Sequence, residues 1–137
     1  METSYKKSKP TQAFDRSRGS VFTLNYHLVL VTRYRAKLLT SEKRRRAAKI
    51  AASLLHRAGG RLLECNGEED HLHLLITLTP SQTPAAIVNT LKSTTSRDLR
   101  TRWPSLKQRR ALWSPSYFIS TCGGASLETV KKYIQEQ

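Results

Sequence analysis

Acidic residues are scarce in this chain. Asp and Glu number 10 against 24 Lys and Arg among 137 residues, which gives a formal net charge of +14 at pH 7. A soluble protein tolerates such a surplus most naturally when its partner is a polyanion. The composition therefore predicts a nucleic-acid partner first, with an anionic membrane surface as the alternative.

Long apolar runs are absent as well. No stretch approaches the roughly 20 residues that span a bilayer, and the first residues lack the apolar core of a signal peptide, so we expect a cytoplasmic protein with no membrane partner. The two cysteines, Cys65 and Cys122, have no CxxC spacing, which fits buried, reduced thiols in a cytosolic protein. No GxxxxGK phosphate loop occurs, and we expect no nucleotide cofactor.

What the chain does contain is a regular alternation of strand and helix patterns. Residues 1–20 are polar and basic without periodicity and predict a flexible arm, and residues 21–137 predict one domain. Apolar periodicity predicts strands at 21–32, 61–65, 71–78 and 116–122 and helices at 41–57, 84–102 and from 126 onward. The order β-α-β-β-α-β with an additional C-terminal helix is that of an α+β, ferredoxin-like (RRM-like) fold, in which two helices cover one face of an antiparallel sheet.

A histidine pair opens the third predicted strand. His71 and His73 follow the acidic run Glu68-Glu69-Asp70, and side chains two apart in a strand leave the same face about 7 Å apart, so both imidazoles can lean toward one cation. With four histidines in the chain, such a pair arises by chance in roughly one chain in ten, so it is a hypothesis when taken alone. His27 fits a hydrogen-bonded strand histidine better than a further site residue.

The predicted last helix carries a tyrosine at the edge of its apolar stripe. Tyr133 and Gln137 are four residues apart and hence neighbours on one helical face. An isolated tyrosine in this place would ordinarily close the rim of the stripe with its hydroxyl in water. The histidine pair raises the chance that Tyr133 is instead a site residue.

Several motifs follow one another in a specific order. They are Tyr26-His27, Arg33-Tyr34-Arg35, His71-Leu72-His73-Leu74-Leu75, the segment LWSPSYFIST at 112–121, Gly123-Gly124, and LETVKKYIQEQ at 127–137. From about Val21 to the end, this combination resembles the IS200/IS605-type single-tyrosine (Y1) transposases of the HUH nuclease superfamily. The combination is far more specific than the histidine pair.

The resemblance implies an activity and roles for particular residues. The chain would be a homodimeric enzyme that cuts and rejoins single-stranded DNA at transposon ends marked by a hairpin, with the tyrosine helix contributed in cis or in trans by the other subunit. Tyr133 would be the nucleophile that forms a 5′-phosphotyrosine. His71, His73 and Gln137 would hold a divalent metal, Mg²⁺ or Mn²⁺. Asp70 fits the family's Asp-His step and could orient an imidazole.

Candidate DNA contacts are basic side chains and aromatic rings that could stack on unpaired bases. They are Arg33, Tyr34, Arg35, Lys92, Arg97, Arg100 and Trp113. Each basic run could equally be a solvated helix face, and Trp113 could equally belong to the core.

Three alternative functions remain open. A domesticated relative could act on repeated chromosomal palindromes. A hydrolase that uses water as nucleophile would need the histidines but not Tyr133. A non-catalytic nucleic-acid-binding module of ferredoxin-like fold is the third, although the aromatic, Gly-rich strand signature of RNA-binding modules is missing.

Overall fold

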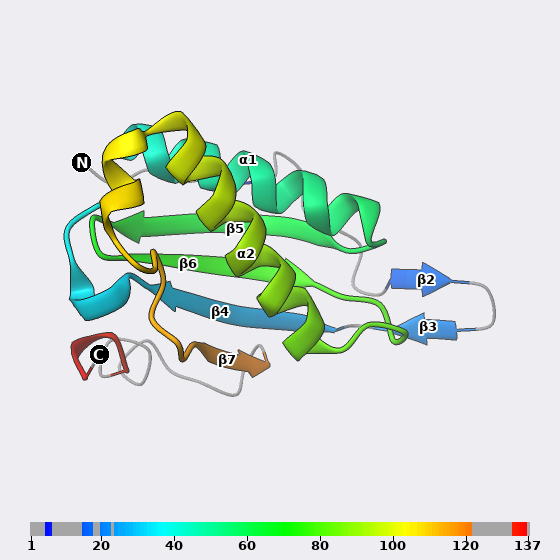
Figure 1. Cartoon of the computed structure of the whole chain (residues 1–137). Coiled ribbons are helices and arrows are strands. Elements are labelled where there is room, and N and C mark those ends of the chain that lie inside the picture. Colours follow the sequence, from blue (N-terminus) through cyan, green and yellow to red (C-terminus); the bar gives the residue numbers. More distant parts are fainter. Residues whose placement is uncertain (1–4, 7–14, 18–19, 23, 122–132, 137) are drawn as a thin grey trace.

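The computed structural model describes residues 5–6, 15–17, 20–22, 24–121 and 133–136 (Figure 1). Along these ranges the elements are β1 (Tyr5–Lys6), β2 (Asp15–Ser17), β3 (Ser20–Phe22), β4 (Asn25–Val31), the 3-10 helix η1 (Arg33–Arg35), α1 (Ser41–Arg57), β5 (Arg61–Glu68), β6 (His71–Thr77), α2 (Pro84–Arg102), the 3-10 helix η2 (Pro104–Gln108) and β7 (Phe118–Thr121).

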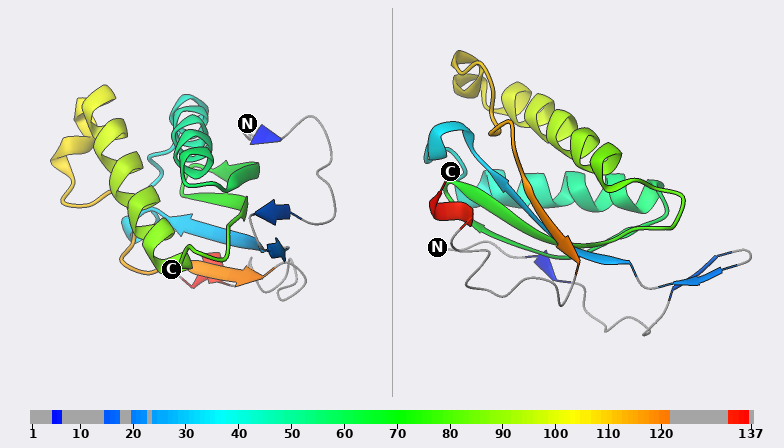
Figure 2. Two further views of the ribbon diagram at one scale, coloured as in Figure 1. Left: turned by 90° about the vertical axis from the view of Figure 1, so that its right-hand side faces the viewer. Right: turned by 90° about the horizontal axis from the view of Figure 1, so that it is seen from below.

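Five strands form one antiparallel sheet in the order β1-β5-β6-β4-β7. Helices α1 and α2 lie side by side on one face of this sheet (Figures 1 and 2). The chain order β4-α1-β5-β6-α2-β7 with this strand arrangement confirms the predicted ferredoxin-like α+β fold. The other face carries neither α1 nor α2, and we call it the helix-free face because these two helices are absent from it.

Both helices have the boundaries that the sequence predicts. The side chains of Thr40 and Thr83 cap the two N-termini, and Pro84 occupies the first turn of α2, where its missing N–H costs nothing. Helix α1 ends before Gly59, whose φ of +91° lies in the left-handed region that favours glycine. Pro104 follows the end of α2.

Side chains of β4 and β6 alternate between two apolar clusters. Leu28, Leu30, Leu72, Leu74 and Ile76 belong to the main core beneath the helices. Val29 and Val31 point the other way and form a second cluster, against which Phe118, Tyr133 and Ile134 pack. The period of two in these strands thus separates the core from the helix-free face.

Strand boundaries differ from the prediction in three places. The single strand predicted at 21–32 is divided into β3, which pairs with β2, and β4. Strand β5 continues to Glu68, so the turn before β6 has only two residues, Glu69 and Asp70. Gly67 is accommodated within the pairing because a Cβ there would clash with the carbonyl oxygen of His71. Strand β7 begins at Phe118, two residues later than predicted.

The two ends of the chain also depart from the expected pattern. Residues 1–20 contain β1 and β2, where no strand was predicted, and Asp15 makes an ion pair with Arg61 at 2.8 Å. The boundary between a flexible arm and a domain at residue 20 stays a prediction. Tyr133 to Gln135 have helical backbone, but most of the predicted last helix, including Gln137, lies outside the described residues.

Two further expectations concern cysteine and membranes. Cys65 is a free thiol with 2% of its surface exposed, as predicted, and burial raises its pKa to about 12. Cys122 lies outside the described residues. No helix in the described ranges is both long and apolar enough to cross a bilayer.

Candidate active site

The predicted histidine pair lies on the helix-free face. His71 and His73 stand opposite Val31 and Val29 of β4 in the antiparallel ladder, and residues directly opposite each other project to the same face of a sheet. Both imidazoles therefore share the face of the second apolar cluster.

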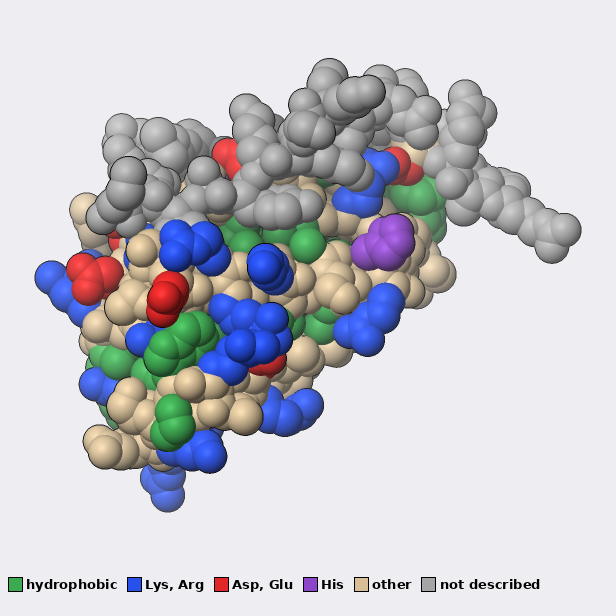
Figure 3. Space-filling view, turned by 90° about the horizontal axis from the view of Figure 1, so that it is seen from above, with side chains coloured by type: hydrophobic (Ala, Val, Ile, Leu, Met, Phe, Trp, Pro, Cys, Tyr) green, Lys and Arg blue, Asp and Glu red, His purple; other side chains and the backbone are tan. Residues whose placement is uncertain are grey.

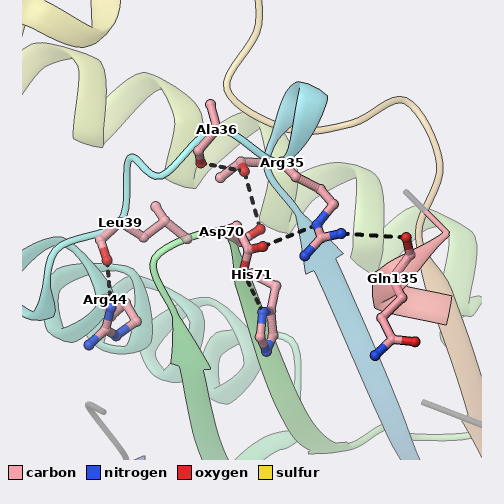
Figure 4. A network of polar contacts seen from close by, with 8 residues as sticks. Arg35, Ala36, Leu39, Arg44, Asp70, His71 and Gln135 are labelled. Atoms are coloured by element: carbon pink, nitrogen blue, oxygen red, sulfur yellow. Dashed lines mark hydrogen bonds and ion pairs between the residues drawn. The ribbon is translucent and has the colours of Figure 1, made fainter. Parts of the chain in front are cut away.

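His71 is held by a chain of polar contacts (Figure 4). Its Nδ1 donates to Asp70 Oδ1 at 2.8 Å, and Arg35 Nε donates to Asp70 Oδ2 at 3.2 Å. Burial raises the pKa of Asp70, but the hydrogen bonds from His71 and Arg35 outweigh burial and hold that pKa below its ordinary value. Asp70 therefore stays ionised at neutral pH and directs His71 Nε2 away from itself.

His73 has a second histidine as its neighbour. Nε2 of His73 and Nδ1 of His27 are 2.9 Å apart, and the two rings are stacked with their centroids at 5.1 Å. Burial lowers the pKa of His73, and His27 and His71 lower it further, while Glu64 opposes them. At neutral pH, His73 is therefore mainly neutral, which is the form that binds metals.

Tyr133 lies on the same face as both histidines. Its ring packs against the Val29–Val31 cluster, and its centroid is 5.3 Å from that of Phe118. The Tyr133 hydroxyl is 3.4 Å from Ser116 Oγ. Arg35 Nη1 donates to the carbonyl oxygen of Gln135 at 3.4 Å (Figure 4), so the residue that braces Asp70 also touches the tyrosine segment.

The donor set on this face suits a divalent metal in its chemistry. His71 offers a nitrogen not used by Asp70, and His73 is neutral and half-buried. No group of three or more His, Cys, Asp or Glu side chains within the described part of the chain could enclose a metal by itself. The third predicted ligand, Gln137, lies outside that part. Imidazole nitrogens with an amide oxygen would fit Mn²⁺ well and Mg²⁺ less tightly.

Two of the predicted DNA contacts make hydrogen bonds within the described structure. Trp113 is 5% exposed and its indole N–H donates to Thr95 Oγ1 at 3.0 Å. This ring belongs to the core and cannot stack on a base, so that prediction is wrong. Lys92 Nζ donates to the carbonyl oxygens of Ser114 at 2.8 Å and Pro115 at 3.2 Å, and burial lowers its pKa. Lys92 thus anchors the segment that leads to β7.

Four other candidate DNA contacts, Arg33, Tyr34, Arg97 and Arg100, line two open cavities. One, of about 460 Å³, is lined by Arg33, Tyr34, Ser105, Gln108, Arg109, Arg110 and Ala111. The other, of about 600 Å³, is lined by Ser93, Ser96, Arg97, Arg100, Thr101 and Lys107. On the side seen from above the orientation of Figure 1, Lys and Arg side chains are spread widely, with few acidic ones among them (Figure 3).

Residues 20–137 match the family described as "Transposase IS200 like". The chain belongs to this family. The ISDra2 transposase TnpA of Deinococcus radiodurans is 31% identical over 125 residues, which cover 89% of each chain. The transposase for insertion sequence element IS200 of Salmonella typhimurium is 29% identical over 115 residues, covering 82% of this chain and 75% of the relative.

Solved structures agree with this assignment. A crystal structure described as that of a transposase from Deinococcus radiodurans R1 superposes with a TM-score of 0.80 at 31% identity, covering 90% of this chain and 97% of the other. A REP-associated tyrosine transposase bound to a REP hairpin superposes with a TM-score of 0.53 at 11% identity, covering 93% and 68% of the two chains. The second likeness concerns the fold alone.

In this IS200-like transposase, sequence reasoning missed three contacts around the predicted residues. His27 was not counted as a site residue, although it shares the strand face of Val29 and Val31. Arg35 was expected to contact DNA, but its guanidinium reaches Asp70. Ser116 lies beside the Tyr133 hydroxyl, and nothing in its local sequence indicates that neighbour.

Proposed function

We propose that this IS200-like transposase cleaves and rejoins single-stranded DNA at transposon ends through a 5′-phosphotyrosine on Tyr133. The observation that supports the proposal is the placement of Tyr133 with His71 and His73 on the helix-free face. A nucleophile and two candidate metal ligands, separated by 60 or more residues in the sequence, thus share one surface.

The proposed reaction conserves the energy of the phosphodiester. The Tyr133 phenol oxygen attacks the scissile phosphorus and loses its proton, while the bond from phosphorus to the 3′ oxygen breaks and that oxygen takes up a proton. The 5′ end stays attached to Tyr133. In the reverse reaction, a 3′-OH attacks the phosphotyrosine, restores a phosphodiester and releases the phenol. No nucleotide cofactor is needed.

His71, His73 and Gln137 are the proposed ligands of a Mg²⁺ or Mn²⁺ ion. When bound, such an ion polarises the phosphate and offsets the charge that builds on its oxygens. Asp70 fixes the ring of His71 through Nδ1, and Arg35 fixes Asp70. Orientation by outer groups of this kind typically strengthens metal binding by limiting the positions of the ligand.

The proposed partners are single-stranded DNA that carries a hairpin and a second copy of the chain. The hairpin-bound transposase supports the fold alone at 11% identity, so hairpin recognition here rests on family membership. Whether the tyrosine helix acts in cis or in trans within a homodimer is part of the proposal to be tested, as is the cytoplasmic location.

A covalent-adduct assay tests the proposal. The protein is incubated with labelled single-stranded DNA from the flanks of its own gene and Mn²⁺, and a denaturing gel is searched for a protein-linked band. We expect this band in the wild type and its complete loss in Tyr133→Phe, because phenylalanine has no oxygen to attack phosphorus. His71→Ala should lower cleavage by at least about tenfold, since one metal ligand is lost.

Tyr26→Phe is the matched control, because Tyr26 packs on the main core rather than on the helix-free face. It should form the adduct like the wild type. An adduct in Tyr133→Phe would show that another residue is the nucleophile. Cleavage that survives Tyr133→Phe without any adduct would favour the water-dependent hydrolase. Binding without cleavage would favour a non-catalytic module or an inactive relative.

A further inference from the structure

The cavity of about 460 Å³ beside η1 combines an aromatic ring with several arginines. Binding of a DNA strand through its phosphates alone requires only the arginines. It is lined by Arg33 and Tyr34 of η1, by Gln108 at the end of η2, and by Arg109 and Arg110, which follow η2. Its volume lies within the range of about 300–1,000 Å³ in which small ligands are bound. A single nucleotide is of this size class.

Tyr34 is held outward by strained backbone. It has φ of +61° and the next residue, Arg35, has φ of +54°, although left-handed backbone costs roughly 1 kcal/mol or more for residues other than glycine. The ring is 82% exposed, which is unusual for a large aromatic side chain in the described chain. Backbone strain that keeps an aromatic ring in solvent indicates a binding role.

One face of the Tyr34 ring is already occupied by a cation. The Arg33 guanidinium carbon lies 5.2 Å from the ring centroid, and at 82% exposure the remaining ring surface is open to solvent. A nucleobase could stack there, and stacking on tyrosine is independent of sequence because every base has a π-face. Arg33, Arg109 and Arg110 make no ion pair with a carboxylate in the described ranges, so their charges remain available to phosphate.

The same 3-10 helix reaches the candidate active site. Arg35 follows Tyr34 directly, and its guanidinium contacts Asp70 and the carbonyl oxygen of Gln135. A DNA strand whose phosphate lies at His71 and Tyr133 therefore has an adjoining section within reach of the cavity. Helix η1 would thus connect the position of the bound DNA strand, through Arg35 and Asp70, with the orientation of the His71 ring.

We infer that this cavity binds one unpaired nucleotide of the single-stranded DNA, with its base stacked on Tyr34 and its phosphates held by Arg109 and Arg110. The inference rests on the proposed function for the identity of the strand. The second cavity, lined by Arg97, Arg100 and Lys107, contains no aromatic residue among its lining. It can hold phosphates but offers no ring to a base.

Two probes separate base stacking from phosphate attraction. One is fluorescein-labelled oligothymidylate, and the other is an abasic oligomer with the same number of phosphates. Dissociation constants are measured by fluorescence anisotropy with the full chain. Tyr34→Asn removes the ring and keeps a residue that accepts left-handed backbone, so this variant retains the fold; Tyr34→Phe keeps the ring.

We expect Tyr34→Asn to weaken oligothymidylate binding by about tenfold, the usual size of a lost stacking contact, and to leave abasic binding nearly unchanged. Tyr34→Phe should match the wild type on both probes. Arg109→Ala and Arg110→Ala should weaken both probes equally, and more than Arg57→Ala, which removes a charge at the far end of α1. Equal effects of Tyr34→Asn on the two probes, or no effect on either, would overturn the inference.

The adduct assay distinguishes this inference from the proposed function. A Tyr133-dependent adduct together with no ring effect would leave the function standing and remove the nucleotide site. If Tyr34→Asn weakens only oligothymidylate binding and no adduct forms, the nucleotide site stands and the proposed function fails.

Discussion

At the scale of single residues, the strongest constraint on the candidate site is the contact between Asp70 and His71. Adjacent residues of a strand normally point to opposite faces, but Asp70 lies in the turn before β6 and its carboxylate folds back to Nδ1 of His71. The carboxylate is fixed in turn by Arg35. The nitrogen that His71 would offer to the proposed metal is thus determined by a residue that need not touch metal or DNA.

Replacement of Asp70 tests this arrangement. Asp70→Asn should weaken Mn²⁺ binding by about 10–100-fold, the usual effect of losing a carboxylate behind a histidine ligand. Isothermal titration calorimetry with Mn²⁺ and no DNA measures this change. Glu69→Gln is the matched control, because Glu69 is an exposed carboxylate in the same turn. Equal affinities for the two variants would contradict the orienting role.

Single residues also show which features of the site can be predicted from the sequence and which cannot. The alternation of β6 places His71 and His73 on one face, and the structure has them there. The sequence left open whether Trp113 is buried or contacts DNA, because its partner Thr95 lies 18 residues earlier on α2. Likewise the contact of His27 with His73 spans 46 residues, and a local pattern carries no information on such pairs.

At the scale of elements, α1 and α2 are joined across the top of the sheet by an ion-pair cluster. Arg46 of α1 donates twice to Asp98 of α2 at 2.9 Å, and Arg102 approaches the same carboxylate at 3.4 Å. The hydrogen bond from Arg46, helped by the charges of Arg46 and Arg102 and opposed by partial burial, lowers the pKa of Asp98. The cluster is the main described polar link between the helices.

This cluster predicts a pH dependence of stability. Because the folded-state pKa of Asp98 lies below the ordinary value of 3.8, its ionised form stabilises the fold above about pH 4 and the effect is lost as pH falls through the lowered pKa. Asp98→Asn should therefore lower the Tm by a few degrees at pH 7. The difference from wild type should shrink below about pH 4.

Thermal unfolding followed by circular dichroism at several pH values measures this effect. A Glu69→Gln variant, which removes an exposed carboxylate from the β5–β6 turn, should show no comparable difference. A gap between wild type and Asp98→Asn that stayed constant down to pH 2 would contradict the assignment, because protonation must abolish the ion pair.

At the scale of the whole molecule, positive charge dominates the described surface. Six cations line the two cavities: Arg33, Arg97, Arg100, Lys107, Arg109 and Arg110. Single-stranded DNA that contacts all six would release counterions with a slope of log K against log salt of about −0.7 for each contact, or about −4 in total.

Salt titration of oligothymidylate binding checks this expectation. The affinity should fall steeply between about 50 and 200 mM KCl, and Arg109→Ala should make the slope shallower by about 0.7. Arg57 lies at the end of α1 and lines neither cavity, so Arg57→Ala should leave the slope unchanged. A slope near zero would show that the cavities do not contact phosphates.

The overall architecture was largely predictable because periodicity and helix caps are local. Helices α1 and α2 begin at capping threonines and end near Gly59 and Pro104, and each of these signals is visible in the sequence. The partners of β1 and β2 were not predictable, since two- and three-residue strands have too few residues to show a period. The left-handed backbone conformation of Tyr34 is not indicated by the sequence either.

The two-residue turn between β5 and β6 has a consequence for insertions and deletions. Its length fixes which side chains of β6 meet the leucine core and which reach the helix-free face. Loss or gain of one residue there would shift the strand by one position and exchange the two sets, placing both imidazoles under the helices and Leu72 and Leu74 on the helix-free face. The proposed catalysis would therefore depend on the two-residue length of this turn as well as on the identity of Asp70.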